Sequence, residues 1–208
     1  MFIISGSTHQ RLGVALAQET GAEFCGVVNK AYPDGERYVR ILRQVSGRDV
    51  VVIQNTFPDE KIVELLLLLE AIREAGAASV TTVIPYMGYA RQERIFQEGE
   101  AIAARAVARP IGMRSDRVLT VSIHTPEVLD FFGCPAEDID GLREVVRYLK
   151  GFTPGLVVAP DAGARERCAI AAKELKAPLH VMTKKRLDDR TVETDSGRVS
   201  IKGQTVVI

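Results

Sequence analysis

The chain has 208 residues, of which 46% are hydrophobic, 27 are basic and 27 are acidic. This length and apolar content suffice for one large or two small globular domains. The balanced charge gives no support for general binding to nucleic acid or to a membrane surface, so any phosphate site must be local.

The cysteines and the apolar runs favour a reducing, aqueous compartment. Cys25, Cys134 and Cys168 are too few and too widely spaced for a disulfide framework or a zinc cluster, and we expect free thiols. Residues 1–4 lack the basic and long apolar regions of a signal peptide, and the longest apolar run, residues 65–69, is too short to cross a bilayer. We predict a cytoplasmic protein.

Short β-branched runs alternate with segments of helical periodicity, which is typical of βαβ units and a mostly parallel sheet. Strands are expected at residues 2–4, 24–28, 39–42, 50–54, 80–84 and 118–123. The clearest helix is expected over residues 60–75, because Pro58 and Asp59 form a stop-and-cap signal and Gly76 ends it. Its residues 62–72 are so apolar that we expect it to be almost entirely buried.

The pattern restarts near Gly141, with a helix to about residue 150 and a break at residues 151–155. A strand, a helix and a strand are expected next, at residues 156–159, 164–175 and 179–182. We therefore predict an α/β protein with two domains, residues 1–140 and 141–208. A last strand-like run at residues 205–208 has no crossover helix after it, so the second domain is expected to be incomplete in this chain.

Ligand-binding residues of α/β folds gather after the carboxyl ends of strands, and four such junctions are polar. The first contains Tyr32, Asp34, Gly35 and Glu36, between two expected strands. An aromatic ring beside two carboxylates can hold a purine, because the carboxylates can accept hydrogen bonds from its amino group. The alternative is a hairpin turn with solvated acids.

The second junction is the segment from Pro85 to Arg94, directly after the strand at residues 80–84. Arginines and a glutamine at a strand end, here Arg91 and Gln92, can clamp phosphate oxygens, and a guanidinium can stack on a base. The alternative is a mobile surface segment.

The third junction pairs His124, after the strand at residues 118–123, with Asp161, after the strand at residues 156–159. A histidine and a carboxylate suit a Mg²⁺ site that water and triphosphate oxygens complete. The alternative for His124 is a structural role, and the helix opening after Asp161 can receive an anion.

The fourth junction is the cationic run from Lys184 to Arg186, with Asp188, Asp189 and Arg190 close behind. In phosphoryl-type transfer the protein has little covalent work to do, so cations placed where charge develops are the main catalytic device. The alternative is a solvated loop.

In chain order these segments resemble the motifs of ribose-phosphate pyrophosphokinases. That family shows Phe-x-Asp-Gly-Glu, then Pro-Tyr-x-x-Tyr-Ala-Arg-Gln-Asp-Arg, Asp-Leu-His with a later Phe-Phe, Ser-Pro-Asp-x-Gly, and Lys-Arg-Arg. The counterparts here are Tyr32 to Glu36, Pro85 to Arg94, Ser122 to His124 with Phe131 and Phe132, Ala159 to Gly163, and Lys184 to Arg186. The second motif is highly specific, and the resemblance extends along essentially the whole chain.

The resemblance implies two phosphoribosyltransferase-type α/β domains with the active site between them. It also implies Mg²⁺-dependent transfer of the β,γ-diphosphoryl group of ATP to the anomeric hydroxyl of ribose 5-phosphate, with release of AMP. In this family a neighbouring subunit completes the ATP pocket, so a homo-oligomer is expected.

The same resemblance assigns a role to each candidate residue. The adenine would bind at Tyr32, Asp34, Gly35 and Glu36, and the rest of the nucleotide at Arg91 and Gln92. The metal would bind at His124 and Asp161, Lys184 would be the catalytic cation, and Arg186 would support it against the phosphates and help to hold ribose 5-phosphate.

Departures from the family pattern are Tyr32 for phenylalanine, Glu93 for aspartate and Ser122 for aspartate. The family's Asp-Asp-x-x-x-Thr-x-Gly-Thr loop, which holds ribose 5-phosphate, is expected after residues 205–208 and is absent. A chain ending there should keep some nucleotide recognition and lose synthesis of the product.

Two other classes of function stay open. A non-catalytic regulatory or scaffolding relative is favoured by the missing loop, whereas the retained cations and metal pair argue against it. A phosphoribosyltransferase that consumes the product would need the missing loop and gives no reason for the motif around Arg91 and Gln92.

Overall fold

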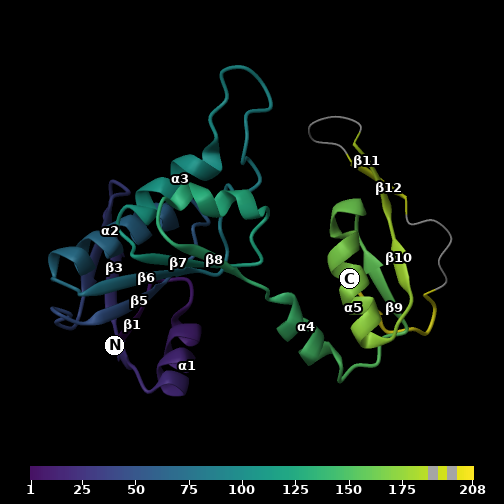
Figure 1. The fold of residues 1–208 in the computed structure, drawn as a ribbon, viewed down its shortest axis with the longest axis horizontal. Helices are drawn as coiled ribbons and strands as arrows, with labels where there is room; N and C mark the ends of the chain where they lie inside the picture. The colour runs from purple at the N-terminus through teal and green to yellow at the C-terminus, as the bar shows by residue number, and fades with distance from the viewer. Residues whose placement is uncertain (187–191, 196–200) are drawn as a thin grey trace. The chain divides into compact units, whose positions relative to one another are not determined.

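The computed structural model describes residues 1–186, 192–195 and 201–208, with backbone alone at residues 184–186 and 192–195. Asp188, Asp189 and Arg190 lie outside the described residues. The chain divides into two compact units, Met1–Ile139 and Asp140–Ile208, so the boundary falls one residue before the expected one. Both units combine helices with parallel strands (Figure 1), which confirms the predicted α/β class.

The first unit is built on a six-stranded parallel sheet with the order β2-β1-β5-β6-β7-β8. Its strands are β1 (Phe2–Ser5), β2 (Glu23–Cys25), β5 (Asp49–Ile53), β6 (Ser79–Ile84), β7 (Arg117–Val121) and β8 (Ala136–Ile139). The central strands β1, β5 and β6 are rich in valine and isoleucine because they are covered on both faces. The sequence did not predict β8, whose residues are mostly exposed.

Helices cover both faces of this sheet (Figure 1). They are α1 (Gln10–Thr20) on one face, and α2 (Glu60–Glu74) and α3 (Ala103–Gly112) on the other, with the 3-10 helix η1 (Pro126–Phe132) beside α3. A small apolar cluster around Ile3, Ala17 and Ile53 lies under α1. The main core lies under α2 and α3.

Helix α2 begins one residue after Asp59, as expected, but it is not almost entirely buried. Leu65, Leu68 and Ile72 are fully buried, whereas Val63 is 48% and Leu67 37% exposed. A helix that covers one face of a sheet buries one stripe only, so the apolar residues on its other side face outward.

Residues of two expected strands form a separate antiparallel hairpin. The expected strand at residues 24–28 is divided at Gly26 into β2 and β3 (Val27–Ala31). Among the residues that the structure describes, β3 pairs only with β4 (Arg37–Ile41). We call β3 and β4 with their connecting turn the hairpin. Val27, Val39 and Ile41 pack against the main core, which attaches the hairpin beside α2.

The second unit has a small parallel sheet in the order β10-β9-β13. Its elements are α4 (Leu142–Leu149), β9 (Leu156–Ala159), the 3-10 helix η2 (Ala162–Ala164), α5 (Arg165–Leu175), β10 (Leu179–Val181) and β13 (Val206–Val207). A two-stranded antiparallel ribbon of β11 (Thr183–Arg186) and β12 (Val192–Asp195) follows β10. The expected cationic loop at residues 184–186 is therefore a strand.

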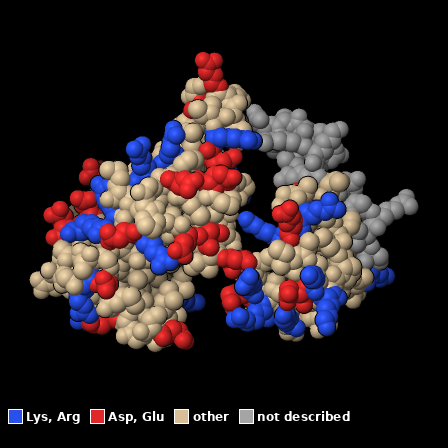
Figure 2. Space-filling view, in the orientation of Figure 1, with Lys and Arg blue, Asp and Glu red and all other residues tan. Residues whose placement is uncertain are grey.

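The described helices include none that is both long and apolar enough to cross a bilayer. Acidic and basic side chains are intermixed over the surface shown in Figure 2, in keeping with the balanced composition.

Candidate functional site

The loops after β1, β5 and β6 meet at the carboxyl edge of the six-stranded sheet. The chain leaves β1 for β2 on one side and later enters β5 on the other, so this edge contains the switch point at which α/β folds usually bind ligands. Three successive polar residues after β5, Gln54, Asn55 and Thr56, join the loops to one another.

Each of these three side chains holds a different part of the edge. Gln54 Oε1 accepts from Thr8 Oγ1 at 2.8 Å, and Thr56 Oγ1 accepts from the Gly88 amide at 2.8 Å. Asn55 Oδ1 accepts from the Tyr86 amide and lies 2.9 Å from His9 Nε2. Sequence reasoning missed this function. The signal that could have revealed these three residues is that they form a polar run directly after a buried strand.

The loop that contains Arg91 and Gln92 is fixed at its start and at its end. The Tyr89 hydroxyl donates to Asp59 Oδ1 at 2.8 Å, and this hydrogen bond, together with the Asp59 charge, raises the pKa of Tyr89. The Gln92 carbonyl accepts from the Ala104 amide at the start of α3. Arg91 is exposed, so its guanidinium is accessible to a ligand while its backbone is held in place.

The segment Tyr32 to Glu36 is the turn of the hairpin and does not follow a strand of the parallel sheet. The Tyr32 amide donates to the Glu36 carbonyl at 2.8 Å, and the Glu36 amide donates to Asp34 Oδ1 at 3.1 Å. Gly35 has a φ of 93°, a conformation that glycine adopts without strain. The local conformation is thus the hairpin turn that was the alternative expectation for this segment. A ligand role for the turn stays a prediction.

A cavity of about 340 Å³ lies between this turn and α2. The hairpin contributes Gly35, Glu36 and Arg37, and α2 contributes Glu60, Val63 and Leu67. Tyr32 is 46% exposed, and its ring makes an edge contact with Tyr38 at 6.2 Å between centroids. An aromatic face and two carboxylates are therefore presented at the tip of the hairpin.

His124 follows β7 and is exposed, as expected for a ligand-binding side chain. The strand end before it is held by Asp138 of β8, which accepts from Thr120 Oγ1 at 2.6 Å and from the Ile123 amide at 2.9 Å. Ser122 has a φ of 49°, which turns the chain sharply before His124. Asp138 is a supporting residue that sequence reasoning missed because it did not predict β8.

Asp161 follows β9 in the second unit, where its Oδ1 accepts from the Ala164 amide at 3.0 Å and caps η2. That bond uses one of the two carboxylate oxygens. His124 and Asp161 belong to different units, so a shared metal stays a prediction. Among the described residues, no three histidine, cysteine or acidic side chains form a metal-binding group.

Lys184 and Arg186 lie on β11, where their backbones pair with Thr194 and Val192 of β12. The predicted cations therefore lie on a hydrogen-bonded ribbon, which holds their backbone positions more firmly than a loop would.

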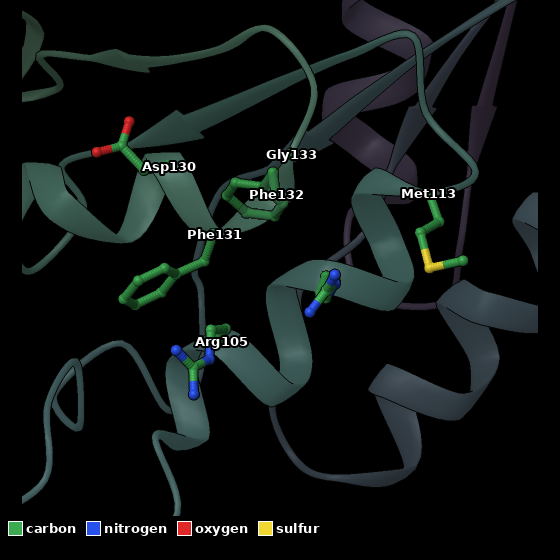
Figure 3. A pocket seen from close by; sticks show the side chains of 7 residues that line it. Arg105, Met113, Asp130, Phe131, Phe132 and Gly133 are labelled. Atoms are coloured by element: carbon green, nitrogen blue, oxygen red, sulfur yellow. The ribbon is translucent and has the colours of Figure 1, made fainter.

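A second cavity, of about 450 Å³, lies between α3 and η1 (Figure 3). It is lined by Arg105, Arg109, Met113 and residues 130–133. Phe131 points toward Arg105, whereas Phe132 is buried in the main core. The two phenylalanines of the family motif thus serve packing between α3 and η1.

Comparisons with known proteins agree with this geometry. A family model described as the N-terminal domain of ribose phosphate pyrophosphokinase matches residues 1–113. The ribose-phosphate pyrophosphokinase of Methanopyrus kandleri is 37% identical over 100% of this chain and 73% of its own length. That of Pyrococcus furiosus is 38% identical over 90% of this chain and 67% of its own length.

A solved structure, the phosphoribosylpyrophosphate synthetase from Mycobacterium smegmatis, has the same fold. It superposes with a TM-score of 0.78 over 99% of this chain and 69% of its own, at 24% identity. The family model covers more than half of the 208 residues, and relatives more than 30% identical align along most of the chain. The chain therefore belongs to the ribose-phosphate pyrophosphokinase family.

Proposed function

We propose that this chain carries the ATP-binding and catalytic residues of a ribose-phosphate diphosphokinase. The reaction transfers the β,γ-diphosphoryl group of ATP to the anomeric hydroxyl of ribose 5-phosphate and releases AMP. The observation that carries the proposal is the loop from Pro85 to Arg94, the most specific family motif. Asp59, Asn55 and Thr56 hold it at the carboxyl edge of the sheet.

The nucleotide is assigned to two elements of the first unit. Arg91 and Gln92 contact the ribose and phosphates, because an exposed guanidinium on a fixed backbone can clamp phosphate oxygens. Tyr32 stacks on the adenine, and Asp34 and Glu36 accept from its amino group, with Gly35 shaping the turn. In the assembled protein a neighbouring copy completes this pocket, so the active form is a homo-oligomer, acting in the cytoplasm.

A magnesium ion is assigned to two donors of the chain, one in each unit. One exposed imidazole, His124, and one carboxylate with an available oxygen, Asp161, make a sparse protein site, which suits a cation that takes most of its ligands from water and phosphate. A Mg²⁺ ion bound there would neutralise part of the negative charge of the triphosphate. Asp138 keeps the strand end before His124 in place, and the η2 cap orients the Asp161 carboxylate.

The transfer itself is assigned to the cations of β11. In the transition state the phosphate oxygens of the transferred group carry negative charge, which the positive charge of Lys184 stabilises. Arg186 contacts the phosphates of both substrates.

The proposal is tested by assaying the full-length protein with Mg²⁺ and ATP, with and without ribose 5-phosphate. We expect AMP only when the sugar phosphate is present, and much less from Arg91→Ala. ADP as the product would contradict the proposal.

Tyr32→Ala is expected to weaken ATP binding by about 1 kcal/mol, the value of a lost aromatic contact. Tyr32→Phe is expected to bind as the wild type does, because it keeps the ring. Calorimetric titration of the full-length protein with ATP measures both. The same affinity in the wild type and in Tyr32→Ala would remove Tyr32 from the site.

His124→Ala and Asp161→Ala are each expected to raise the Mg²⁺ concentration needed for half-maximal activity. The double variant should lose little more than the worse single variant, because two ligands of one ion are not independent. Activity measured against Mg²⁺ concentration at fixed ATP gives the comparison. If the two effects add fully, the residues act separately and do not share an ion.

A further inference from the structure

The carboxylate at the start of helix α2 does not cap the helix. Asp59 occupies the N-cap position, where an aspartate side chain usually accepts from an amide of the first turn, but it makes no such hydrogen bond. The amides of Lys61 and Ile62 donate instead to the carbonyls of Pro58 and Asp59, at 2.8 Å and 3.0 Å. Asp59 Oδ1 accepts from the Tyr89 hydroxyl at 2.8 Å, so this side chain supports the loop after β6.

The partner of Asp59 has an unfavourable backbone conformation. Tyr89 has a φ of 64°, in the left-handed region, which a bulky residue seldom adopts because its Cβ crowds the following carbonyl oxygen. Tyr89 is 44% exposed, so burial of its side chain does not explain the conformation. Such a conformation persists only where surrounding contacts hold it, and the hydrogen bond to Asp59 is one of these contacts.

The backbone of Tyr89 sets the direction of the chain at Arg91. The residue before Tyr89 is fixed, because the Gly88 amide donates to Thr56 Oγ1 at 2.8 Å and a Cβ at Gly88 would lie 2.7 Å from the Thr56 carbonyl oxygen. The Tyr89 carbonyl accepts from the Gln92 amide at 3.1 Å, which closes a turn over residues 89–92. Since both ends are tied, a change in the φ of Tyr89 would redirect the chain at Arg91.

We propose that Asp59 is a positioning residue for nucleotide binding: its hydrogen bond with the Tyr89 hydroxyl keeps Tyr89 in the left-handed conformation and so directs Arg91 toward the phosphates. This inference rests on the proposed function, which gives Arg91 its role on the nucleotide. One contact then accounts for two departures from local preference, an aspartate at a helix start that caps no amide and a tyrosine with a positive φ.

The first test is Tyr89→Phe in the full-length protein, with Tyr86→Phe as the matched control. Both changes remove a hydroxyl from an exposed tyrosine of the same loop, but the hydrogen bond to Asp59 is made by Tyr89. We expect the KM for ATP to rise about fivefold in Tyr89→Phe, while kcat at saturating ATP and the KM for ribose 5-phosphate stay within about twofold. Tyr86→Phe should leave all three values within about twofold of the wild type.

A second measurement does not depend on nucleotide. The Gln92 amide, which donates to the Tyr89 carbonyl, should exchange hydrogen about fivefold faster in Tyr89→Phe than in the wild type. The urea midpoint of unfolding should be the same in both proteins, because the hydrogen bond is exposed and holds a loop. Unchanged exchange at Gln92, or faster exchange with an unchanged KM for ATP, overturns the inference.

Further variants separate the hydrogen bond from the conformation that it holds. Asp59→Asn keeps an oxygen acceptor and should lose less ATP affinity than Asp59→Ala, which should behave as Tyr89→Phe does. Tyr89→Gly should bind ATP more tightly than Tyr89→Ala, because glycine adopts a positive φ without strain. The opposite order in either pair contradicts the inference.

The proposed function is tested separately, by titration of the wild type and of Arg91→Ala with ATP. A loss of affinity in Arg91→Ala with none in Tyr89→Phe overturns the role of Asp59 alone. A wild type that does not bind ATP contradicts the proposed function, and with it the role given to Arg91.

Discussion

Lys184→Ala is expected to lower kcat of the full-length protein by about two to three orders of magnitude, while the affinity for ATP changes little. A cation that acts on charge developing during transfer stabilises the transition state much more than the bound substrate. The backbone of Lys184 is paired with Thr194 in the β11–β12 ribbon, so replacing the side chain leaves the strand itself in place. Steady-state AMP release and calorimetric titration with ATP separate the two effects.

Lys185→Ala is the matched control, because it removes a neighbouring positive charge from the same strand. We expect its kcat to stay within about twofold of the wild type, since the resemblance assigns Lys184 and Arg186 the catalytic work. Near-normal turnover in Lys184→Ala would exclude that residue from the mechanism. An equal loss in both variants would indicate a general effect of charge on the ribbon.

Gly112→Ala is expected to destabilise the first unit by about 3 kcal/mol, because overpacking at a rigid contact has no low-energy relief. Gly112 is the last residue of α3, and a Cβ at this position would overlap the carbonyl oxygen of Phe132 in η1. That oxygen belongs to the backbone and cannot rotate away as a side chain would. The free energy of unfolding in urea, measured for wild type and variant, gives the size of the effect.

Ala106→Ser provides the comparison for Gly112→Ala, because it adds one atom at an exposed position of the same helix. Its free energy of unfolding is expected to stay within about 0.5 kcal/mol of the wild type. If Gly112→Ala were as stable as Ala106→Ser, α3 and η1 could not approach each other as closely as the structure shows.

The central strands could be predicted from the sequence because their burial on both faces requires apolar, β-branched runs. Strand β8 could not, since its residues Ala136 to Ile139 lie mostly exposed at the edge of the sheet and carry little of that pattern. The strands of the hairpin could be predicted as strands, but their pairing could not, because Val27 and Val39 look like residues of the parallel sheet and only the pairing partner distinguishes the two. The residue types in a segment indicate whether it is buried, but they do not indicate which strand it pairs with.

In the candidate site, too, some residues could be predicted from the sequence and others could not. The residues assigned to chemistry, such as Arg91 and His124, stand out because polar side chains at strand ends are unusual and their order matches a family. The residues that hold them do not stand out. Asp59 looks like a helix cap but contacts Tyr89, and Asp138 supports Ile123 from a strand that the pattern missed. Such contacts depend on the packed fold, so the structure is needed to find them.

The most direct test of the central claim follows the phosphorus atoms. Phosphorus NMR of the full-length protein with Mg²⁺, ATP and ribose 5-phosphate records which bond breaks. We predict that the β and γ phosphorus atoms move together to the anomeric oxygen of the sugar, with AMP formed in equal amount and no reaction in the absence of ribose 5-phosphate. Transfer of the γ phosphorus alone, with ADP as the second product, would contradict the assignment of diphosphoryl transfer to this chain.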